Sequence, residues 1–269
     1  MPPLRPVDPR RLEWLRPENV AERDLAAARE RLAPCLARGD LAPVYEARRR
    51  AIYRVDDPVL GSVAVKEVRS GGWLRAVRFR RFAPHPALRE LRVGAAFAAR
   101  GGATAPLLAA ALECDRLRLH RVFLCLRWVE QAQNLGAFLR GLGREPDGPA
   151  LASITEALLA AARLGLVHGR HSGDNLLVTQ AEGRPEIRVI DFAHASLAAG
   201  FEPEGFARDA GRIAASLVIL GHASEATAMH LLGALAAAWP DPPSAPRAPE
   251  RLDAAYRRSL AEGPPAQTR

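Results

Sequence analysis

Lysine is almost absent from this 269-residue sequence, because 37 of its 38 basic residues are arginine and Lys66 is the one exception. Cysteine is scarce as well: the chain has 3, an odd number with no metal-like spacing, so a disulfide framework is excluded and a reducing compartment is expected. Long apolar runs are also missing, since 213–220 and 231–239 are under half the length of a membrane span. A transmembrane protein is therefore not expected, and residues 1–16 lack the apolar core of a signal peptide.

Charge is distributed unevenly along the chain. Residues 1–100 hold 21 basic and 12 acidic residues, a net charge of +9, whereas residues 101–269 hold 17 and 18, a net charge of −1. The densest basic stretch, 66–92, favours an anionic partner such as a phosphorylated substrate, an acidic membrane surface or a nucleic acid. The alternative is a solvated face that reflects codon bias. Nucleic acid is not expected, because the chain has no zinc spacing, RNA-binding signature or basic helix with heptads.

Hydrophobic patterning divides the chain into a mixed part and a mainly helical part, with the change near residue 130. We expect a helical extension over 1–39, a small β-rich lobe over 40–130, and a helical lobe over 131–269 with a proline-rich linker and a C-terminal helix. The expected strand segments are 44–45, 51–53, 62–68, 109–113 and 117–129, with a hairpin of 176–179 and 187–190 turning at 182–185. The expected helices are 20–33, 87–99, 134–142, 150–164, 205–220, 224–239 and 249–260, with 240–249 as an extended linker.

Lys66 ends the β-type run Val-Ala-Val. A lysine on a rigid strand can hold nucleotide phosphates if a carboxylate orients its ammonium group, and Glu90 on the next expected helix can supply that carboxylate. The alternative is an ordinary surface lysine at the end of a strand. That alternative is weakened because the chain uses arginine at its other 37 basic positions.

Two further segments carry chemistry-bearing side chains. The polar segment 166–178 leads into the expected hairpin, and the amide oxygen of its Asn175 suits Mg²⁺. Asp191 follows an apolar run and would present a carboxylate at the end of a strand, where it could hold a metal that bridges phosphates. Each can also be an ordinary turn residue, so the order and spacing of the three elements carry more weight than any one of them.

Together these segments resemble the protein-kinase-like fold. The run 63–66 is similar to the strand motif with the phosphate-binding lysine, and Glu90 is similar to its helix partner. Residues 168–175 resemble the catalytic loop, His-x-Asp-x-x-x-x-Asn, and 191–193 resemble the metal-binding Asp-Phe-Gly. Over roughly 40–220, the resemblance implies an α+β, two-lobed fold with a small β-rich N-lobe and a helical C-lobe. It also implies ATP and Mg²⁺ as cofactors, with Asn175 and Asp191 as metal ligands.

Within that fold the chain is similar to bacterial lipopolysaccharide core kinases, which phosphorylate Kdo or heptose sugars. The narrower resemblance rests on the arginine-rich insert 75–81, on the segment 88–94, and on Trp-Val-Glu at the expected hinge, 128–130. It implies a phosphotransferase that acts on an alcohol group of a lipopolysaccharide-type glycolipid. Lys66, Glu90 and Glu130 would then contact the nucleotide.

The sequence departs from the family pattern at three places. Arg170 stands where the catalytic loop has aspartate, and a guanidinium cannot accept a proton. Ala193 replaces a glycine, and the glycine-rich loop is reduced to Gly39. Since phosphoryl transfer depends on positioning and charge neutralisation, the resemblance still allows catalytic roles for His168, Arg170 and Asp174.

In such an enzyme, Arg170 would bind a substrate phosphate, and His171 or Asp174 would serve as the base. His171 and Asp174 can equally be a core histidine and a solvated turn residue.

We therefore expect an ATP-dependent kinase in the cytoplasm whose substrate is an anionic glycolipid or phosphorylated sugar. The insert, with Trp73, Leu74, Val77, Phe79 and Phe82, would make peripheral contact with anionic headgroups of the inner membrane surface or would bind substrate phosphates. It can instead be a basic loop packed on the small lobe. Two other functions stay open: a nucleotide-binding pseudokinase with a regulatory partner, and a small-molecule phosphotransferase.

Overall fold

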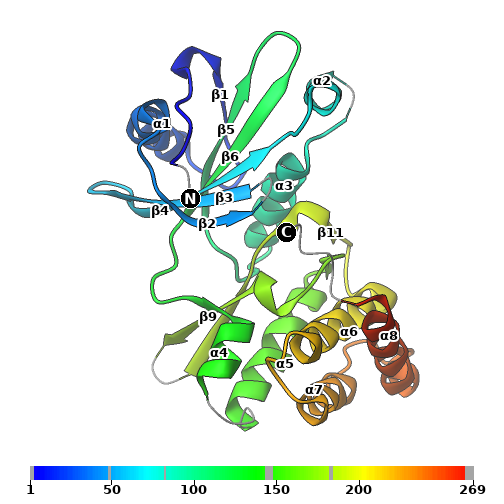
Figure 1. Cartoon of the computed structure of the whole chain (residues 1–269). Coiled ribbons are helices and arrows are strands. Elements are labelled where there is room, and N and C mark those ends of the chain that lie inside the picture. The colour runs from blue at the N-terminus through cyan, green and yellow to red at the C-terminus, as the bar shows by residue number, and fades with distance from the viewer. Residues whose placement is uncertain (1–2, 48–49, 82, 143–147, 182–183, 264–269) are drawn as a thin grey trace. The chain divides into compact units, whose positions relative to one another are not determined.

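The computed structural model describes residues 3–47, 50–81, 83–142, 148–181 and 184–263 (Figure 1). Contacts between residues divide the described chain into two compact units. Unit one comprises the described residues of 3–96 and 105–128, and unit two those of 97–104 and 129–263. The finer boundaries expected from the sequence, 1–39, 40–130 and 131–269, stay a prediction.

Unit one is built on one antiparallel sheet with the strand order β1-β5-β6-β4-β3-β2. Its strands are β1 (Leu12–Leu15), β2 (Pro43–Ala47), β3 (Arg50–Asp57), β4 (Gly61–Arg69), β5 (Leu107–Cys114) and β6 (Leu119–Arg127). β1, which pairs with β5, is not predicted from the sequence, where residues 1–39 are expected to be a helical extension.

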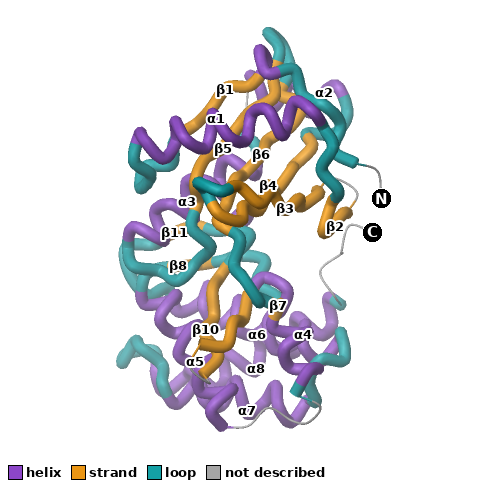
Figure 2. Tube along the Cα trace, turned by 90° about the vertical axis from the view of Figure 1, so that its left-hand side faces the viewer, coloured by secondary structure: helices purple, strands orange, loops and turns teal. Residues whose placement is uncertain are grey.

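The sheet of unit one is buried on both faces by helices. Along β6, Phe123 and Cys125 pack with α1 (Glu22–Arg38), whereas Val122 and Leu124 pack with α3 (Pro86–Ala99). This alternation follows from the two-residue period of a strand, which points successive side chains to opposite faces. Figure 2 shows α1 and α3 with the strands between them. Any polar side chain directed to one of these faces is therefore in a helix-covered interior.

The arginine-rich insert is helical. α2 (Trp73–Arg81) occupies the stretch that the sequence analysis treated as a basic insert or loop. Arginine is a good helix former, and Ala76 supplies a buried contact toward the rest of unit one. Phe82, which was expected to belong to the same surface, lies outside the described residues.

Unit two is mainly helical around two small antiparallel sheets. Its helices are α4 (Leu135–Gly141), α5 (Gly148–Arg163), α6 (Pro203–Ile219), α7 (Glu225–Ala237) and α8 (Ala248–Glu262). Its strands are β7 (Gln133–Asn134), β8 (Leu166–Val167), β9 (Leu176–Ala181), β10 (Arg184–Val189) and β11 (Ser196–Leu197). The predicted hairpin corresponds to β9 and β10, and part of its predicted turn, 182–183, lies outside the described residues.

The helices of unit two pack closely at α6 and α8. A Cβ atom on Gly211 of α6 would lie 2.7 Å from the backbone of Tyr256, so only glycine allows this approach. The predicted extended linker 240–249 is partly wrong, because the short 3-10 helix η4 (Ala245–Arg247) lies within it and α8 begins at Ala248. None of the helices in the described ranges is long and apolar enough to cross a membrane.

Candidate active site

Lys66 forms a buried ion pair with Glu90 inside unit one. Its ammonium nitrogen lies 2.7 Å from Oε1 and 2.8 Å from Oε2 of Glu90. The two side chains are only 11% and 7% exposed. A buried charge is tolerated when it is paired and hydrogen-bonded, and both conditions hold for this pair.

The two-residue strand period explains why Lys66 meets Glu90. Val63 and Val65 of β4 point to the face covered by α1, so Lys66 between Val65 and Glu67 points to the face covered by α3. The sheet register places Lys66 opposite Leu124, which packs with α3. On α3, Ala87 and Leu91 contact the sheet, and Glu90 lies on the same side at helical spacing.

Two loops of unit two are held side by side by strand pairing. Residues 168–175 connect β8 to β9, and residues 190–195 connect β10 to β11. Since β8 pairs with β11 and β9 with β10, both loops run between the same two ladders. Two hydrogen bonds join them: Nε2 of His168 donates to the carbonyl oxygen of Ile190 at 2.9 Å, and the amide of Ile190 donates to the carbonyl oxygen of Asn175 at 3.0 Å.

This pairing brings the two predicted metal ligands to one end of the hairpin. Leu176 pairs with Val189, so Asn175 and Asp191 both lie just beyond the last rung of the ladder. Asp191 has φ 65° and ψ 60°, a left-handed conformation. Only Gln131 shares a positive φ among the non-glycine residues that the structure describes. A strained backbone of this kind is concentrated at functional sites.

The donor set at the hairpin end fits a magnesium ion. The Nδ2 atom of Asn175 donates to the carbonyl oxygen of Arg170 at 2.9 Å, which orients the amide, and within the described ranges no group donates to its Oδ1 atom. Asn175 Oδ1 and the carboxylate of Asp191 are both hard oxygen ligands. No group of three or more His, Cys, Asp or Glu that could hold a metal occurs among the described residues. Mg²⁺ needs no such group, because it is commonly held by one or two side chains together with substrate phosphates.

Helix α6 anchors the loop 168–175 through three side chains that the sequence analysis missed. The carboxylate of Asp209 accepts the amides of His168 at 2.5 Å and of Gly169 at 3.0 Å. One turn later Arg212 donates to the carbonyl oxygen of Gly169, and Ser216 Oγ accepts the amide of Gly173 at 3.0 Å. The spacing of 209, 212 and 216 places all three on one helix face.

Asp209 is the unusual member of this set because it is an acidic side chain in a buried position. Burial raises its pKa, and the amide hydrogen bonds from His168 and Gly169 oppose that shift. The sequence did contain a signal for it: Asp209 lies at helical spacing from the apolar residues Phe206 and Ile213 and next to Ala210. An acid in such a position needs partners, and the backbone of the loop supplies them.

No protein-family model matches the sequence, and no curated protein matches it. Among solved structures 1079 chains match. One of them, WaaP in complex with acyl carrier protein, has a TM-score of 0.55 at 16% sequence identity and aligns over 82% of this chain and 89% of that chain. The chain has a kinase-like fold. At this identity the likeness establishes the fold alone, and it confirms the predicted α+β, two-lobed architecture.

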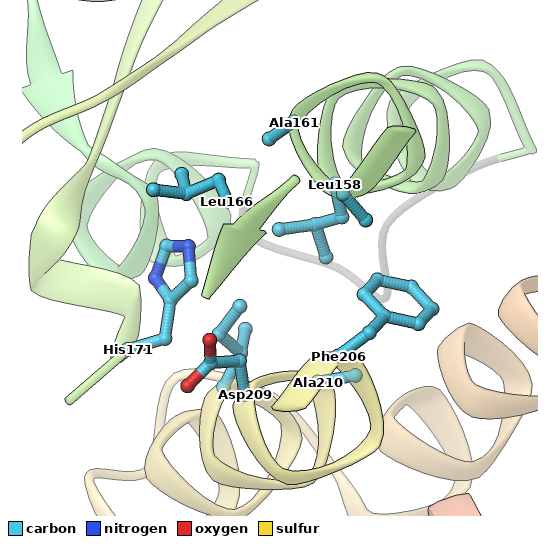
Figure 3. Close-up of a pocket in the computed structure, with 9 residues that line it drawn as sticks. Leu158, Ala161, Leu166, His171, Phe206, Asp209 and Ala210 are labelled. Atoms are coloured by element: carbon cyan, nitrogen blue, oxygen red, sulfur yellow. The ribbon is translucent and has the colours of Figure 1, made fainter. Parts of the chain in front are cut away.

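In this kinase-like fold two histidines of the loop 168–175 are buried against each other. The rings of His168 and His171 are stacked, with centroids 4.2 Å apart and planes 21° apart. Figure 3 shows His171 and Asp209 at a cavity of about 10 Å³ that is lined mainly by apolar side chains, among them Leu158 and Phe206. Burial, followed by the charge of His168, lowers the pKa of His171 well below its usual value of 6.5. His171 is therefore a neutral core histidine and is poorly placed to act as a base.

The remaining predicted site residues lie at the surface or near it. Arg170 is exposed on the loop, and Asp174 is half-buried in the 3-10 helix η2 (Gly173–Asn175). Glu130 is exposed in the turn between β6 and β7. Their nucleotide and substrate roles stay predictions.

Gly39 does not belong to a phosphate-binding loop. It ends α1 with φ 69°, and its amide donates to the carbonyl oxygen of Cys35. A Cβ atom at this position would lie 2.6 Å from the carbonyl oxygen of Leu4. Gly39 is required as a helix cap against the N-terminal segment, so its assignment as a remnant of the glycine-rich loop is wrong.

Proposed function

We propose that this chain is an ATP- and Mg²⁺-dependent kinase that phosphorylates a hydroxyl group on the sugar of a lipopolysaccharide-type glycolipid. One observation carries the proposal: the single lysine of the sequence is buried on a strand, where both oxygens of Glu90 hold it. Solvent-exposed lysines need no such partner. A lysine that binds nucleotide phosphates needs its ammonium group fixed in this way.

The proposal gives the predicted residues of each unit separate tasks. Lys66 orients phosphate oxygens of the nucleotide, and Glu90 orients Lys66. Asn175 and Asp191 hold Mg²⁺, which when bound neutralises charge on the transferring phosphoryl group. The anchoring of the loop by Asp209 and Ser216 keeps Asn175 in place without contact between these side chains and the substrate.

Arg170 and Asp174 act on the acceptor. The exposed guanidinium of Arg170 is suited to a phosphate or carboxylate on the acceptor sugar, which it can bind through two parallel hydrogen bonds. Asp174 is the carboxylate in the loop that can accept the hydroxyl proton. The choice of an anionic sugar acceptor rests on Arg170 and on the resemblance of 75–81 and 88–94 to lipopolysaccharide core kinases.

A transfer assay with radiolabelled ATP, Mg²⁺ and purified lipopolysaccharide core tests the proposal. We expect label in the glycolipid with the natural chain and none above background with Lys66→Met. Arg170→Gln should raise KM for a phosphorylated acceptor about tenfold, because one charge-assisted contact is lost, and should leave the Kd for ATP unchanged. If the natural chain binds Mg·ATP but transfers no phosphoryl group, the proposal that it is a kinase is wrong.

That refuting result would favour the second candidate, a nucleotide-binding pseudokinase. Arg170 is the observation that favours it, since an arginine replaces the aspartate that serves as base in the resembled loop. Mg·ATP would then raise the melting temperature of the natural chain without any transfer. Arg170→Asp would be expected to create transfer in that case.

A further inference from the structure

Three of the large apolar side chains exposed in unit one gather at one end of it. Trp73 and Leu74 begin α2 and are 61% and 75% exposed. Leu117, 52% exposed, lies in the turn between β5 and β6. The side chain of Arg81 donates to the carbonyl oxygen of Arg116 at 3.5 Å, which places the end of α2 beside this turn, as Figure 1 also shows. Exposed apolar side chains gathered in this way mark an interaction surface.

Exposed arginines lie on the same helix and in the same turn as these apolar side chains. Leu74, Arg78 and Arg81 are spaced for one face of α2, whereas Ala76 faces the interior. Arg116 adds a further exposed guanidinium from the neighbouring turn. We call Trp73, Leu74, Arg78, Arg81, Arg116 and Leu117 the α2 surface.

The acidic groups near the α2 surface are already paired with other bases. Glu13 holds Arg80 at 2.7 Å, and Asp115 holds Arg118 at 3.1 Å and His120 at 2.9 Å. Within the described ranges no acidic side chain pairs with Arg78, Arg81 or Arg116. The α2 surface therefore combines a net positive charge with exposed apolar side chains.

We infer that the α2 surface docks on an anionic lipid bilayer. A short basic helix with exposed tryptophan and leucine matches the boundary between headgroups and acyl chains, where tryptophan rings are enriched and cations meet lipid phosphates. The excess charge is complementary to anionic headgroups, and the apolar side chains add a contact that a purely electrostatic partner would not use. This inference does not depend on phosphoryl transfer: a chain without kinase activity would still dock.

Charge and insertion make separable contributions to this docking. Each arginine near an anionic surface strengthens binding by about fivefold, so Arg78→Gln with Arg116→Gln should weaken it by about twenty-five-fold. Both side chains are exposed, so the folded chain should tolerate the changes. Trp73 should report insertion through a shift of its fluorescence to shorter wavelength.

The experiment is co-sedimentation of the full chain with vesicles of phosphatidylcholine containing about one third phosphatidylglycerol, against pure phosphatidylcholine. We expect binding to the mixed vesicles, weakened by salt, and little binding to the neutral ones. The blue shift should occur with the natural chain and vanish in Trp73→Phe, because the remaining tryptophans, Trp14, Trp128 and Trp239, lie outside the α2 surface.

The matched control is Arg29→Gln with Arg258→Gln, which removes the same charge from exposed positions of α1 and α8. It should bind nearly as well as the natural chain. Equal weakening by the control and by the Arg78 and Arg116 variant, or binding without a Trp73 shift, would overturn the inference in favour of diffuse attraction. Binding of an acidic protein through these residues, with no binding to vesicles, would overturn it in favour of a protein partner.

Discussion

Lys66 and Glu90 form a buried polar contact in the interior of unit one. The pair is bidentate and nearly inaccessible to solvent, and it joins β4 to α3 across 24 residues of sequence. In such a pair the cost of desolvating each charge is offset by the opposite charge and by hydrogen bonds. Removal of one partner should therefore cost more than the pair contributes.

Glu90→Gln tests this asymmetry. It leaves a buried ammonium group facing a neutral amide, and we expect the free energy of unfolding to fall by about 3 kcal/mol. In the double variant Lys66→Met with Glu90→Gln, the free energy of unfolding should fall by much less than the sum of the losses in the two single variants. Urea unfolding followed by tryptophan fluorescence provides the measurement. Additive losses would mean that the two groups do not depend on each other.

At the scale of elements, α3 begins at a buried histidine. The Nδ1 atom of His85 accepts the amide of Ala87 at 3.2 Å, and Phe79 of α2 packs edge-on to the ring. Burial, followed by the nearby charge of Arg75, lowers the pKa of His85 to about 4. The neutral ring is therefore a fixed part of the helix start that carries Glu90.

The lowered pKa makes this helix start sensitive to acid. Between pH 6.5 and 4 the unfolded chain binds a proton at His85 and the folded chain does not, so stability is lost as the pH falls through that range. The loss attributable to His85 should approach about 3 kcal/mol at pH 4. His85→Asn keeps an acceptor for Ala87 and removes the titration. Urea unfolding at pH 7 and pH 4.5 should therefore show a smaller acid loss in the variant, and an equal loss would contradict the assignment.

The elements of the fold were largely predictable, because most strands and helices bury a periodic apolar face. The predicted helix 87–99 corresponds to α3 and the predicted hairpin to β9 and β10. β1 and the helical state of 73–81 were not predictable from apolar period, since β1 has only four residues and arginines interrupt 73–81.

The candidate site was only partly predictable. Lys66, Asn175 and Asp191 stand in short motifs whose spacing can be read directly. Asp209 contacts His168 from 41 residues away, and no local pattern relates the two. The role of His171 became clear only from its burial, since the sequence alone allowed either a base or a core residue.

At the scale of the whole molecule, each unit encloses its own interior, and the N-terminal residues belong to the interior of unit one. Leu4 and Val7 pack in the same core as α1, and the side chain of Arg121 donates to the carbonyl oxygens of Arg5 and Pro6. The three cysteines also lie in unit one and are free thiols. Cys114 and Cys125 are buried, and burial raises the pKa of both to about 12, whereas Cys35 is half-buried in α1.

Thiol reactivity therefore reports on the packing of unit one. With a water-soluble disulfide reagent at pH 8, we expect Cys35 of the folded chain to react rapidly and to release about one equivalent of the reagent's thiol. The other two cysteines should not react, because their thiols are inaccessible and protonated. In the unfolded chain all three cysteines should react with the reagent. Cys35→Ser should abolish the rapid phase, and a rapid phase that survives in this variant would show that the interior of unit one opens.

The single lysine gives this chain an uncommon experimental property. An amine-directed acylating reagent has one side-chain target in the sequence, and that target is held against Glu90 with little access to solvent. The rate of Lys66 acylation, followed by mass spectrometry, therefore measures how often the ammonium group leaves its carboxylate. A bound nucleotide that takes over part of the contact should change that single rate, so occupancy can be followed without a label on the ligand and without turnover.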